Sequence, residues 1–211
     1  GNFDRWGTDC GLFVSPQRLP KFKFKAGLEE SFYDNQHLYE FPYVGLVYIP
    51  QPLYQFNLNS EFKLGKLRVP NADYLDATNL SLTTNIARRA SSKIYTSGYI
   101  YLEKSKTKED PYSYYGGALG VSLSFDLIYD WRLKPFGSAG KRLYEGDDPF
   151  WGETRKDTRF MVGVTLKKIN WQIFGYAPEL GVSYEETNSN IDYYSYSKVG
   201  VIVKFDEILS L

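Results

Sequence analysis

The sequence has almost none of the side chains from which metal, disulfide and nucleophilic sites are built. Its 211 residues include one cysteine, Cys10, and one histidine, His37. A lone cysteine cannot form an intramolecular disulfide, and a lone imidazole cannot supply the clustered histidines of most transition-metal sites. Asp34 precedes His37 in an expected loop, but one such pair without a second positioned pair does not indicate catalysis. We therefore expect no enzyme activity, no metal and no cofactor.

The sequence also lacks an excess of charge of either sign, and it lacks any long apolar run. Lys and Arg total 25, and so do Asp and Glu, so no basic surface is available to attract nucleic acid. Because no stretch of about 18 apolar residues occurs, we expect neither a membrane-spanning helix nor a signal peptide. Such a chain can still enter a membrane, since the strands of a membrane barrel alternate apolar with polar residues.

Aromatic residues are abundant, with 19 Tyr and 14 Phe against one Met. Aromatic rings pack well on pleated sheets. No helical period extends over a useful length, whereas a two-residue alternation recurs, as where the apolar Phe56 and Leu58 flank the polar Asn57. The sequence therefore predicts an all-β protein, with residues 1–211 forming one domain.

Turn residues divide the chain into about eleven strands. We expect these strands near residues 8–15, 21–32, 40–49, 53–64, 74–86, 93–103, 113–125, 128–136, 155–166, 171–184 and 193–205. Most have roughly the ten residues that a tilted membrane strand needs, whereas strands in soluble sandwiches average about five or six. The sequence therefore favours an antiparallel transmembrane β-barrel.

The expected connections fall into two alternating sets. The short set is 16–20, 50–52, 87–92, 126 and 167–170, and the longer, polar set is 33–40, 65–73, 104–111, 137–153 and 185–192. Short turns on one rim and long loops on the other are typical of outer-membrane barrels. Tyrosines at strand ends, such as Tyr193 and Tyr196, suit the headgroup levels of a bilayer. We expect the protein to lie in the bacterial outer membrane and to contact its lipid.

The polar parity of the strands should line the lumen, because an unpaired polar side chain in hydrocarbon costs several kcal/mol. These residues are Lys23, Lys25, Glu29, Gln55, Asn57, Asn59, Glu61, Lys63, Arg159, Glu179, Glu185, Lys198 and Lys204. Charges of both signs predict mutual pairing rather than a ring that selects ions of one sign. Arg155 and Asp157 share a parity after the longest expected loop, which predicts a rim pair, either a salt-bridged latch or a solvated pair.

The C-terminal third resembles the β-barrel of the surface lipoprotein assembly modifiers. The similar positions are Tyr144, the DPFWG of Asp148–Gly152, Arg155 and Asp157, the GYAP of Gly175–Pro178, Ser189 and Asn190, the stretch Tyr194–Lys198, and Phe205. The earlier hairpins agree only in rhythm. Two features depart from the family pattern: Lys198 stands where an arginine is expected, and DEILSL follows Phe205.

Proteins of that family combine a periplasmic helical-repeat domain with a barrel, and they help lipoproteins cross the outer membrane to the cell surface. The resemblance implies the same role here, with a surface lipoprotein as cargo. No helical repeat is present, so we expect the barrel without its periplasmic part. The closing alternation also resembles the C-terminal signal that the barrel assembly machinery recognises; it consists of Val199, Val201, Val203 and Phe205.

Three classes of function stay open on the sequence alone. A translocation barrel for lipoproteins rests on the C-terminal resemblance. A general outer-membrane porin or polysaccharide-export channel rests on the expected fold. A soluble β-sandwich that binds a partner is the third.

Eleven strands raise a problem of closure. In a closed antiparallel barrel of one bacterial chain the first and last strands pair in opposite directions, so the number of strands is even. A strand end within residues 1–7, a miscounted hairpin, or further upstream strands could explain the odd number. We favour the third explanation, with about 12–14 strands in total. The first strand, near residues 8–15, should then lack a neighbour from within this chain.

Overall fold

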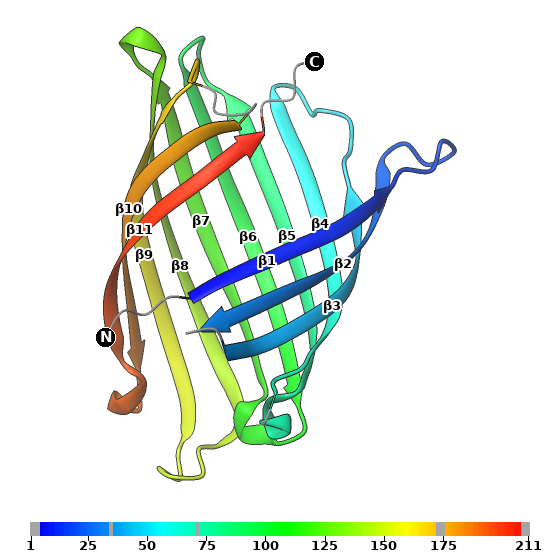
Figure 1. Ribbon diagram of the computed structural model, residues 1–211, viewed down its shortest axis with the longest axis vertical. Coiled ribbons are helices and arrows are strands. Elements are labelled where there is room, and N and C mark those ends of the chain that lie inside the picture. Colours follow the sequence, from blue (N-terminus) through cyan, green and yellow to red (C-terminus); the bar gives the residue numbers. More distant parts are fainter. Residues whose placement is uncertain (1–4, 34–35, 71, 172–175, 208–211) are drawn as a thin grey trace.

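The computed structural model describes residues 5–33, 36–70, 72–171 and 176–207, which form one curved antiparallel sheet (Figure 1). Its strands are β1 (Arg5–Val14), β2 (Phe22–Tyr33), β3 (Gln36–Tyr48), β4 (Phe56–Leu67), β5 (Ala77–Arg89), β6 (Ile94–Thr107), β7 (Tyr114–Asp126), β8 (Trp131–Asp147), β9 (Thr154–Lys168), β10 (Tyr176–Ser189) and β11 (Tyr196–Glu207). Single 3₁₀ turns connect some of them: η1 (Asp73–Leu75), η2 (Asp110–Tyr112), η3 (Ile128–Asp130) and η4 (Asp192–Tyr194). None of the helical turns in these residues is long or apolar enough to cross a membrane.

The sheet is a simple meander in which each strand pairs with the next along the chain. The order runs from β1 to β11 without a crossover, and every pair is antiparallel. The predicted all-β class and the eleven strands are therefore confirmed. Most strand bounds differ from the predicted ones by a few residues.

The expected loop at 137–153 is wrong, because β8 continues to Asp147. Gly137 and Gly140 suggested a turn, yet both lie inside the ladder. Gly140 pairs with Ala118 on β7 and with Arg159 on β9. A β-carbon at Gly140 would lie 2.9 Å from the Gly117 carbonyl oxygen. Glycine therefore allows close packing between strands here rather than a change of direction.

The expected difference in loop length between the two rims is also wrong. On one rim the connections span residues 15–21, 49–55, 90–93, 127–130 and 169–175, and on the other 34–35, 68–76, 108–113, 148–153 and 190–195. The lengths of the two sets overlap, because strands such as β6 and β8 extend into stretches that looked like polar loops. We name the second set the η rim, since it carries η1, η2 and η4.

The sheet exposes most of its large apolar side chains. The hydrophobic side chains buried in the described part of the chain are Phe41, Tyr43, Ala77, Ala177 and Ile191. By contrast, Leu119 and Val121 on β7 are 60% and 68% exposed, and Val199 and Val201 on β11 are 77% and 79% exposed. A soluble domain of this size buries such residues in a core. This sheet has its apolar surface on the outside.

The cross-strand register joins these apolar side chains into a continuous band. Phe62 pairs with Leu82, and Leu82 pairs with Leu102. Near the other end of the strand order, Leu180 on β10 pairs with Val203 on β11. Directly paired residues share a face. All eleven strands belong to one sheet, so no second described sheet covers the band. The soluble β-sandwich is therefore wrong.

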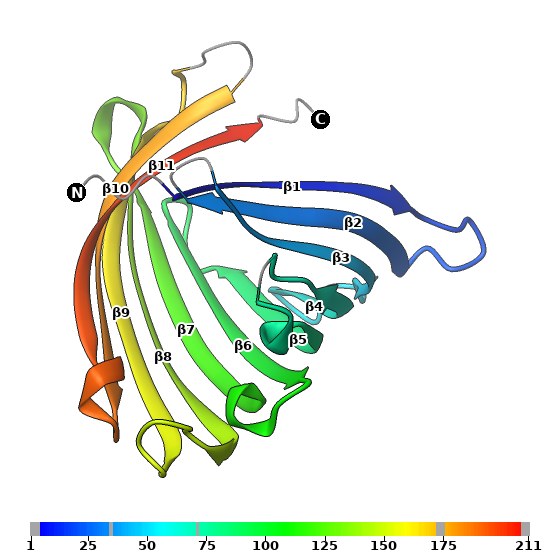
Figure 2. The same cartoon turned by 60° about the horizontal axis from the view of Figure 1, so that its bottom comes forward.

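The edges of the sheet are β1 and β11. Their described residues pair with β2 and β10 respectively and form no ladder with each other. Because strand direction reverses at every step, both edge strands run the same way, and their C-terminal ends diverge (Figures 1 and 2). They cannot pair antiparallel. The expectation that the first strand lacks a second neighbour within this chain agrees with this geometry.

Two strand glycines provide a matched test of the packing. A β-carbon at Gly181 would press on the Val164 carbonyl oxygen and lie 2.7 Å from Thr165, whereas one at Gly137 would have nothing nearer than the Met161 carbonyl oxygen at 3.6 Å. Gly181→Ala should lower the free energy of unfolding by about 1–3 kcal/mol. Gly137→Ala should leave it unchanged or raise it by up to about 1 kcal/mol. Urea unfolding in detergent measures both, and equal losses would contradict the packing argument.

Candidate functional site

Polar side chains on the other face of the sheet reach across intervening strands. Glu103 on β6 and Arg142 on β8 are separated by β7, so their backbones stand roughly 10 Å apart. Nevertheless, Arg142 Nε lies 2.7 Å from Glu103 Oε1. The residue between them in the ladder is Gly116, which has no side chain to block the contact. Side chains converge in this way on the inside of a bend, so the polar face is the concave face.

Two tyrosines complete the surroundings of this ion pair. The hydroxyls of Tyr101 and Tyr114 donate hydrogen bonds to Glu103 Oε2, at 3.1 and 3.3 Å. The Arg142 guanidinium lies 4.7 Å from the centroid of the Tyr114 ring. A hollow of about 130 Å³ beside the pair has the small residues Ala118 and Gly140 in its lining. The pair is thus fixed by several partners and borders open space.

Four of the expected lumen residues meet on β2 and β4 in the same manner. Lys63 Nζ lies 3.2 Å from Glu29 Oε2, and Lys25 Nζ lies 3.6 Å from Glu61 Oε1. Gly45 on β3 stands between the two lysines in the ladder. Opposite charges therefore pair across the intervening strand, as the sequence predicted.

Two amide residues of the expected set are placed differently from each other. Asn59 on β4 accepts a hydrogen bond from Asn85 Nδ2 on β5 at 2.8 Å. Gln55 was expected in a strand, but it lies in the turn before β4, where its Oε1 accepts hydrogen bonds from Arg88 at 2.9 and 3.2 Å. The strand begins later than predicted because residues 53–55 form the turn.

The remaining predicted residues are only partly described. Lys23 is half-buried on β2, Asn57 is exposed on β4, and Glu179 is buried on β10. The side chains of Lys204 and Phe205 lie outside the described residues, as does Asp34 of the weak pair with His37. Val199, Val201 and Val203 lie on the exposed apolar face.

Glu185 on β10 brings together three of the predicted or resembling residues. Its Oε1 lies 2.9 Å from Arg159 and 3.4 Å from Lys198, and it accepts a hydrogen bond from the Tyr196 hydroxyl at 3.0 Å. Glu185 is 9% exposed. Lys198, at the position where the resemblance predicted an arginine, supplies a cation to this carboxylate.

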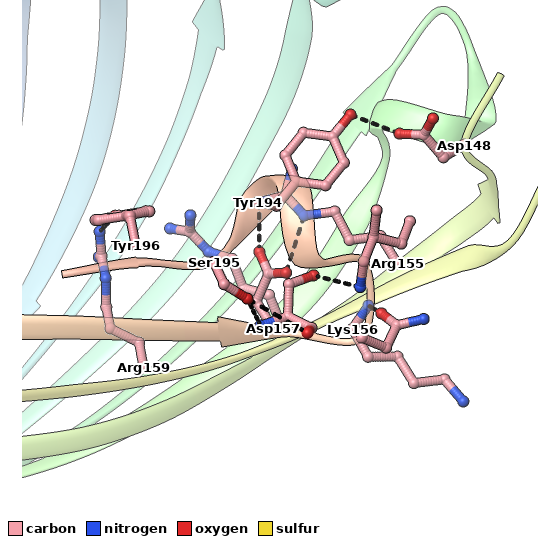
Figure 3. A network of polar contacts seen from close by, with 12 residues as sticks. Asp148, Arg155, Lys156, Asp157, Arg159, Tyr194, Ser195 and Tyr196 are labelled. Carbon is pink, nitrogen blue, oxygen red and sulfur yellow. Dashed lines mark hydrogen bonds and ion pairs between the residues drawn. The ribbon is translucent and has the colours of Figure 1, made fainter. Parts of the chain in front are cut away.

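The predicted rim pair of Arg155 and Asp157 does form, on β9 at the η rim (Figure 3). Two parallel hydrogen bonds join them, Nε to Oδ1 at 2.9 Å and Nη2 to Oδ2 at 2.7 Å. Asp157 is buried, and the guanidinium also lies 3.7 Å from the centroid of the Tyr194 ring. Of the two readings left open, the geometry is that of a latch rather than of a solvated pair.

Tyr194 extends the latch to the preceding hairpin connection. Its hydroxyl donates a hydrogen bond of 2.6 Å to Asp148 Oδ2 (Figure 3). Asp148 Oδ1 accepts hydrogen bonds from the backbone amides of Phe150 and Trp151, at 2.9 and 3.2 Å. The latch, which we define as Asp148, Arg155, Asp157 and Tyr194, therefore ties the β8–β9 connection to the β10–β11 connection.

The hydrogen bond between Tyr194 and Asp148 shifts both pKa values. Burial disfavours the carboxylate of Asp148, but the hydrogen bonds from Tyr194 and from the two amides outweigh it and lower its pKa. The bond to Asp148, together with burial, raises the pKa of Tyr194 to about 12. The pair is thus most stable with Asp148 ionised and Tyr194 protonated.

Sequence reasoning missed two sets of contacts: the ion pair of Glu103 with Arg142, and the contacts that Tyr194 and Asp148 add to the pair of Arg155 and Asp157. Glu103 and Arg142 were not paired because Arg142 was assigned to a loop. A signal for Asp148 was available, since each of four connections of the η rim contains an aspartate at a turn: Asp73, Asp110 and Asp192 begin 3₁₀ turns, and Asp148 begins the β8–β9 connection. Within the described residues, no three His, Cys, Asp or Glu side chains are grouped to hold a metal ion.

The Tyr194 hydroxyl can be tested by titration. The raised pKa of Tyr194 means that its contribution to stability is present below the ordinary tyrosine pKa of about 10 and is lost as the pH rises through about 12. In ultraviolet difference spectra, Tyr194→Phe should remove one tyrosine that titrates near pH 12. Tyr193→Phe, a change at the adjacent and 76% exposed ring, serves as the control. Loss of a tyrosine that titrates near pH 10 from Tyr194→Phe would contradict the latch.

Comparison with known protein families finds a match that includes nearly all of the residues described above. No curated protein matches the chain. The family model described as surface lipoprotein assembly modifier matches residues 30–208, which include β3 to β11 and the whole latch. The resemblance that the C-terminal third suggested thus extends over most of the sheet, and the chain belongs to the surface lipoprotein assembly modifier family.

Proposed function

We propose that this chain forms an outer-membrane barrel wall and that its concave face borders a path by which lipoproteins reach the cell surface. The observation that carries the proposal is the division of one sheet into an exposed apolar face and a polar face whose charges pair with one another. Family membership supplies the role in surface lipoprotein assembly. The path through the membrane is our addition to that role.

The height of the apolar band supports a membrane setting. On β9 the outward residues from Phe160 to Leu166 are apolar and are bounded by Lys156 and Lys168. At ~3.3 Å per residue and a tilt of ~40°, residues 156–168 rise about 30 Å. The two lysines are thus separated by about the thickness of a hydrocarbon core, roughly 30 Å, and the apolar residues lie between them. Lys168 also lies 5.8 Å from the ring of Trp131, and such a pair suits the headgroup level.

The concave face argues against a porin that selects ions of one sign, which is one form of the porin alternative. Selection of one sign needs a ring of like charges. Here Glu29, Glu103 and Glu185 each meet a cation. The family is one of lipoprotein assembly rather than a known enzyme family, and we propose no catalytic role.

Orientation and assembly complete the proposal. We propose that the last strand ends at the periplasmic rim, which puts the η rim at the cell surface. Val199, Val201 and Val203 are 77%, 79% and 55% exposed on the apolar face. With Phe205 they suit recognition by the barrel assembly machinery, which we propose as a partner besides lipid and the lipoprotein cargo.

The membrane setting is tested by the parity of lipid contact. Single cysteine labels at 58 and 62 should be quenched by lipid-soluble quenchers, because Leu58 and Phe62 have the outward parity. Labels at 59 and 61 should be protected, because Asn59 and Glu61 face Asn85 and Lys25. Cys10→Ser removes the exposed native thiol first. Equal quenching of the labels at 58 and 62 and of those at 59 and 61 would contradict the membrane proposal.

Translocation is tested in cells that express a surface lipoprotein with and without the full natural protein. The lipoprotein should be cleaved by added protease, or labelled by antibody on intact cells, only when the protein is present. Its total amount in the outer membrane should stay the same. A gain in uptake of small solutes without a gain in surface lipoprotein would favour the porin instead.

A further inference from the structure

Three lysines gather on the outward face of the sheet at the η rim. Lys104, Tyr115, Leu143 and Lys156 form one row of the ladder, with a lysine on β6 and another on β9. Lys141 on β8 lies two residues nearer the middle of the sheet on the same face. All three lysines are exposed. We call Lys104, Lys141 and Lys156 the lysine triad.

The triad borders the apolar band directly. Leu102, Leu119 and Phe160 have the outward parity just below it and are 52%, 60% and 49% exposed. Tyr115 lies within the row and is 52% exposed, as expected of a ring at the headgroup level. The ammonium groups therefore stand at the level where the phosphates of a lipid would lie.

Basic and acidic neighbours share this face with the triad. Lys106 also points outward here and meets Asp110 at 2.6 Å and Glu145 at 2.8 Å. Glu145 also lies 3.5 Å from Lys104. The described residues provide no ion pair for Lys141 or Lys156. Lys66, Asp147 and Glu186 also have the outward parity near this group, but neither of these two carboxylates forms an ion pair with the triad.

Among the residues that the structure describes, the opposite rim has no comparable group. Its outward cations at the edge of the band include Arg88 on β5 and Lys168 on β9, four strands apart. Arg88 is bonded to Gln55 and Lys168 lies near Trp131. The triad is therefore not a general property of strand ends in this sheet.

The spacing of the triad indicates more than one phosphate. Strand separation and rise place the α-carbons of Lys141 and Lys156 ~8 Å apart, and that of Lys104 ~12–14 Å from both. One phosphate can be reached by two of these side chains but leaves the third unused. We propose that the lysine triad binds the headgroup of a bisphosphorylated lipid, whose acyl chains lie along Leu102, Leu119 and Phe160. This inference rests on the membrane setting of the proposed function.

The test uses the purified protein in a zwitterionic detergent and three lipid probes. Diphosphoryl lipid A, monophosphoryl lipid A and phosphatidylglycerol are titrated, and bound lipid is counted by native mass spectrometry. Diphosphoryl lipid A should bind about tenfold more tightly than the other two, because more ammonium groups engage phosphate. Equal affinity for all three lipids would overturn the proposal.

Variants locate the binding. Lys141→Gln with Lys156→Gln should lose the preference for diphosphoryl lipid A, while Lys141→Arg with Lys156→Arg should keep it. Lys21→Gln with Lys93→Gln removes the same charge from two exposed lysines of the opposite rim and should have no effect. Equal losses in the control and the triad variant would reject the site. If the glutamine variant fails to fold, the arginine variant decides: loss of the preference there, in folded protein, rejects the lysine geometry.

The outcome is distinguishable from failure of the proposed function. If the protein does not insert into phosphatidylcholine vesicles, the membrane proposal is contradicted, and the lipid-binding inference is contradicted with it. A protein that inserts but shows no preference among the three lipids fails this inference alone.

Discussion

The whole structure depends on one requirement, which is that the backbone hydrogen bonds of every strand be made by its neighbours. A single meander of eleven antiparallel strands meets it for all but the outer edges of β1 and β11. Once the ladder is continuous, side chains can only alternate between two faces. The sequence assigns apolar residues to one face and charged, amide and small residues to the other. Both the proposed membrane setting and the polar concave face rest on that division.

The concave face shows how a curved sheet can carry many charges without leaving them unpaired. Ion pairs there do not join adjacent strands alone. Glu103 reaches Arg142 over Gly116, and Lys63 and Lys25 stand on either side of Gly45. A larger residue at either glycine would fill the space that the charged side chains cross. Small residues in the middle strand are thus part of the electrostatic design.

The sequence predicted the parts of this structure that depend on local alternation. The class, the eleven strands, the two faces and the pairing of opposite charges such as Lys63 with Glu29 were all accessible. Strand ends were not, because glycine was read as a turn residue at Gly137 and Gly140. In the ladder Gly137 has room for a β-carbon, whereas Gly140 serves close packing between strands. That function depends on the neighbouring strands and has no signature within its own segment.

The latch was half accessible for a related reason. Arg155 and Asp157 are two residues apart on one strand, so their common face could be predicted from the chain alone. Tyr194 and Asp148 come from separate connections. Their contact depends on the pairing of β9 with both β8 and β10, which brings the two connections together at one rim. Only the assembled sheet shows that contact.

The ion pair between Glu103 and Arg142 has a mechanical consequence. The pair spans β7. The separation of β6 and β8 forms the base of a triangle, and the side chains of Glu103 and Arg142 form its other two sides. The length of those side chains therefore sets how sharply β6, β7 and β8 bend. Glu29 and Lys63 also link β2 to β4 over β3, but along a diagonal of the ladder. The curvature of the wall thus depends on the length of the side chains at a few charged positions.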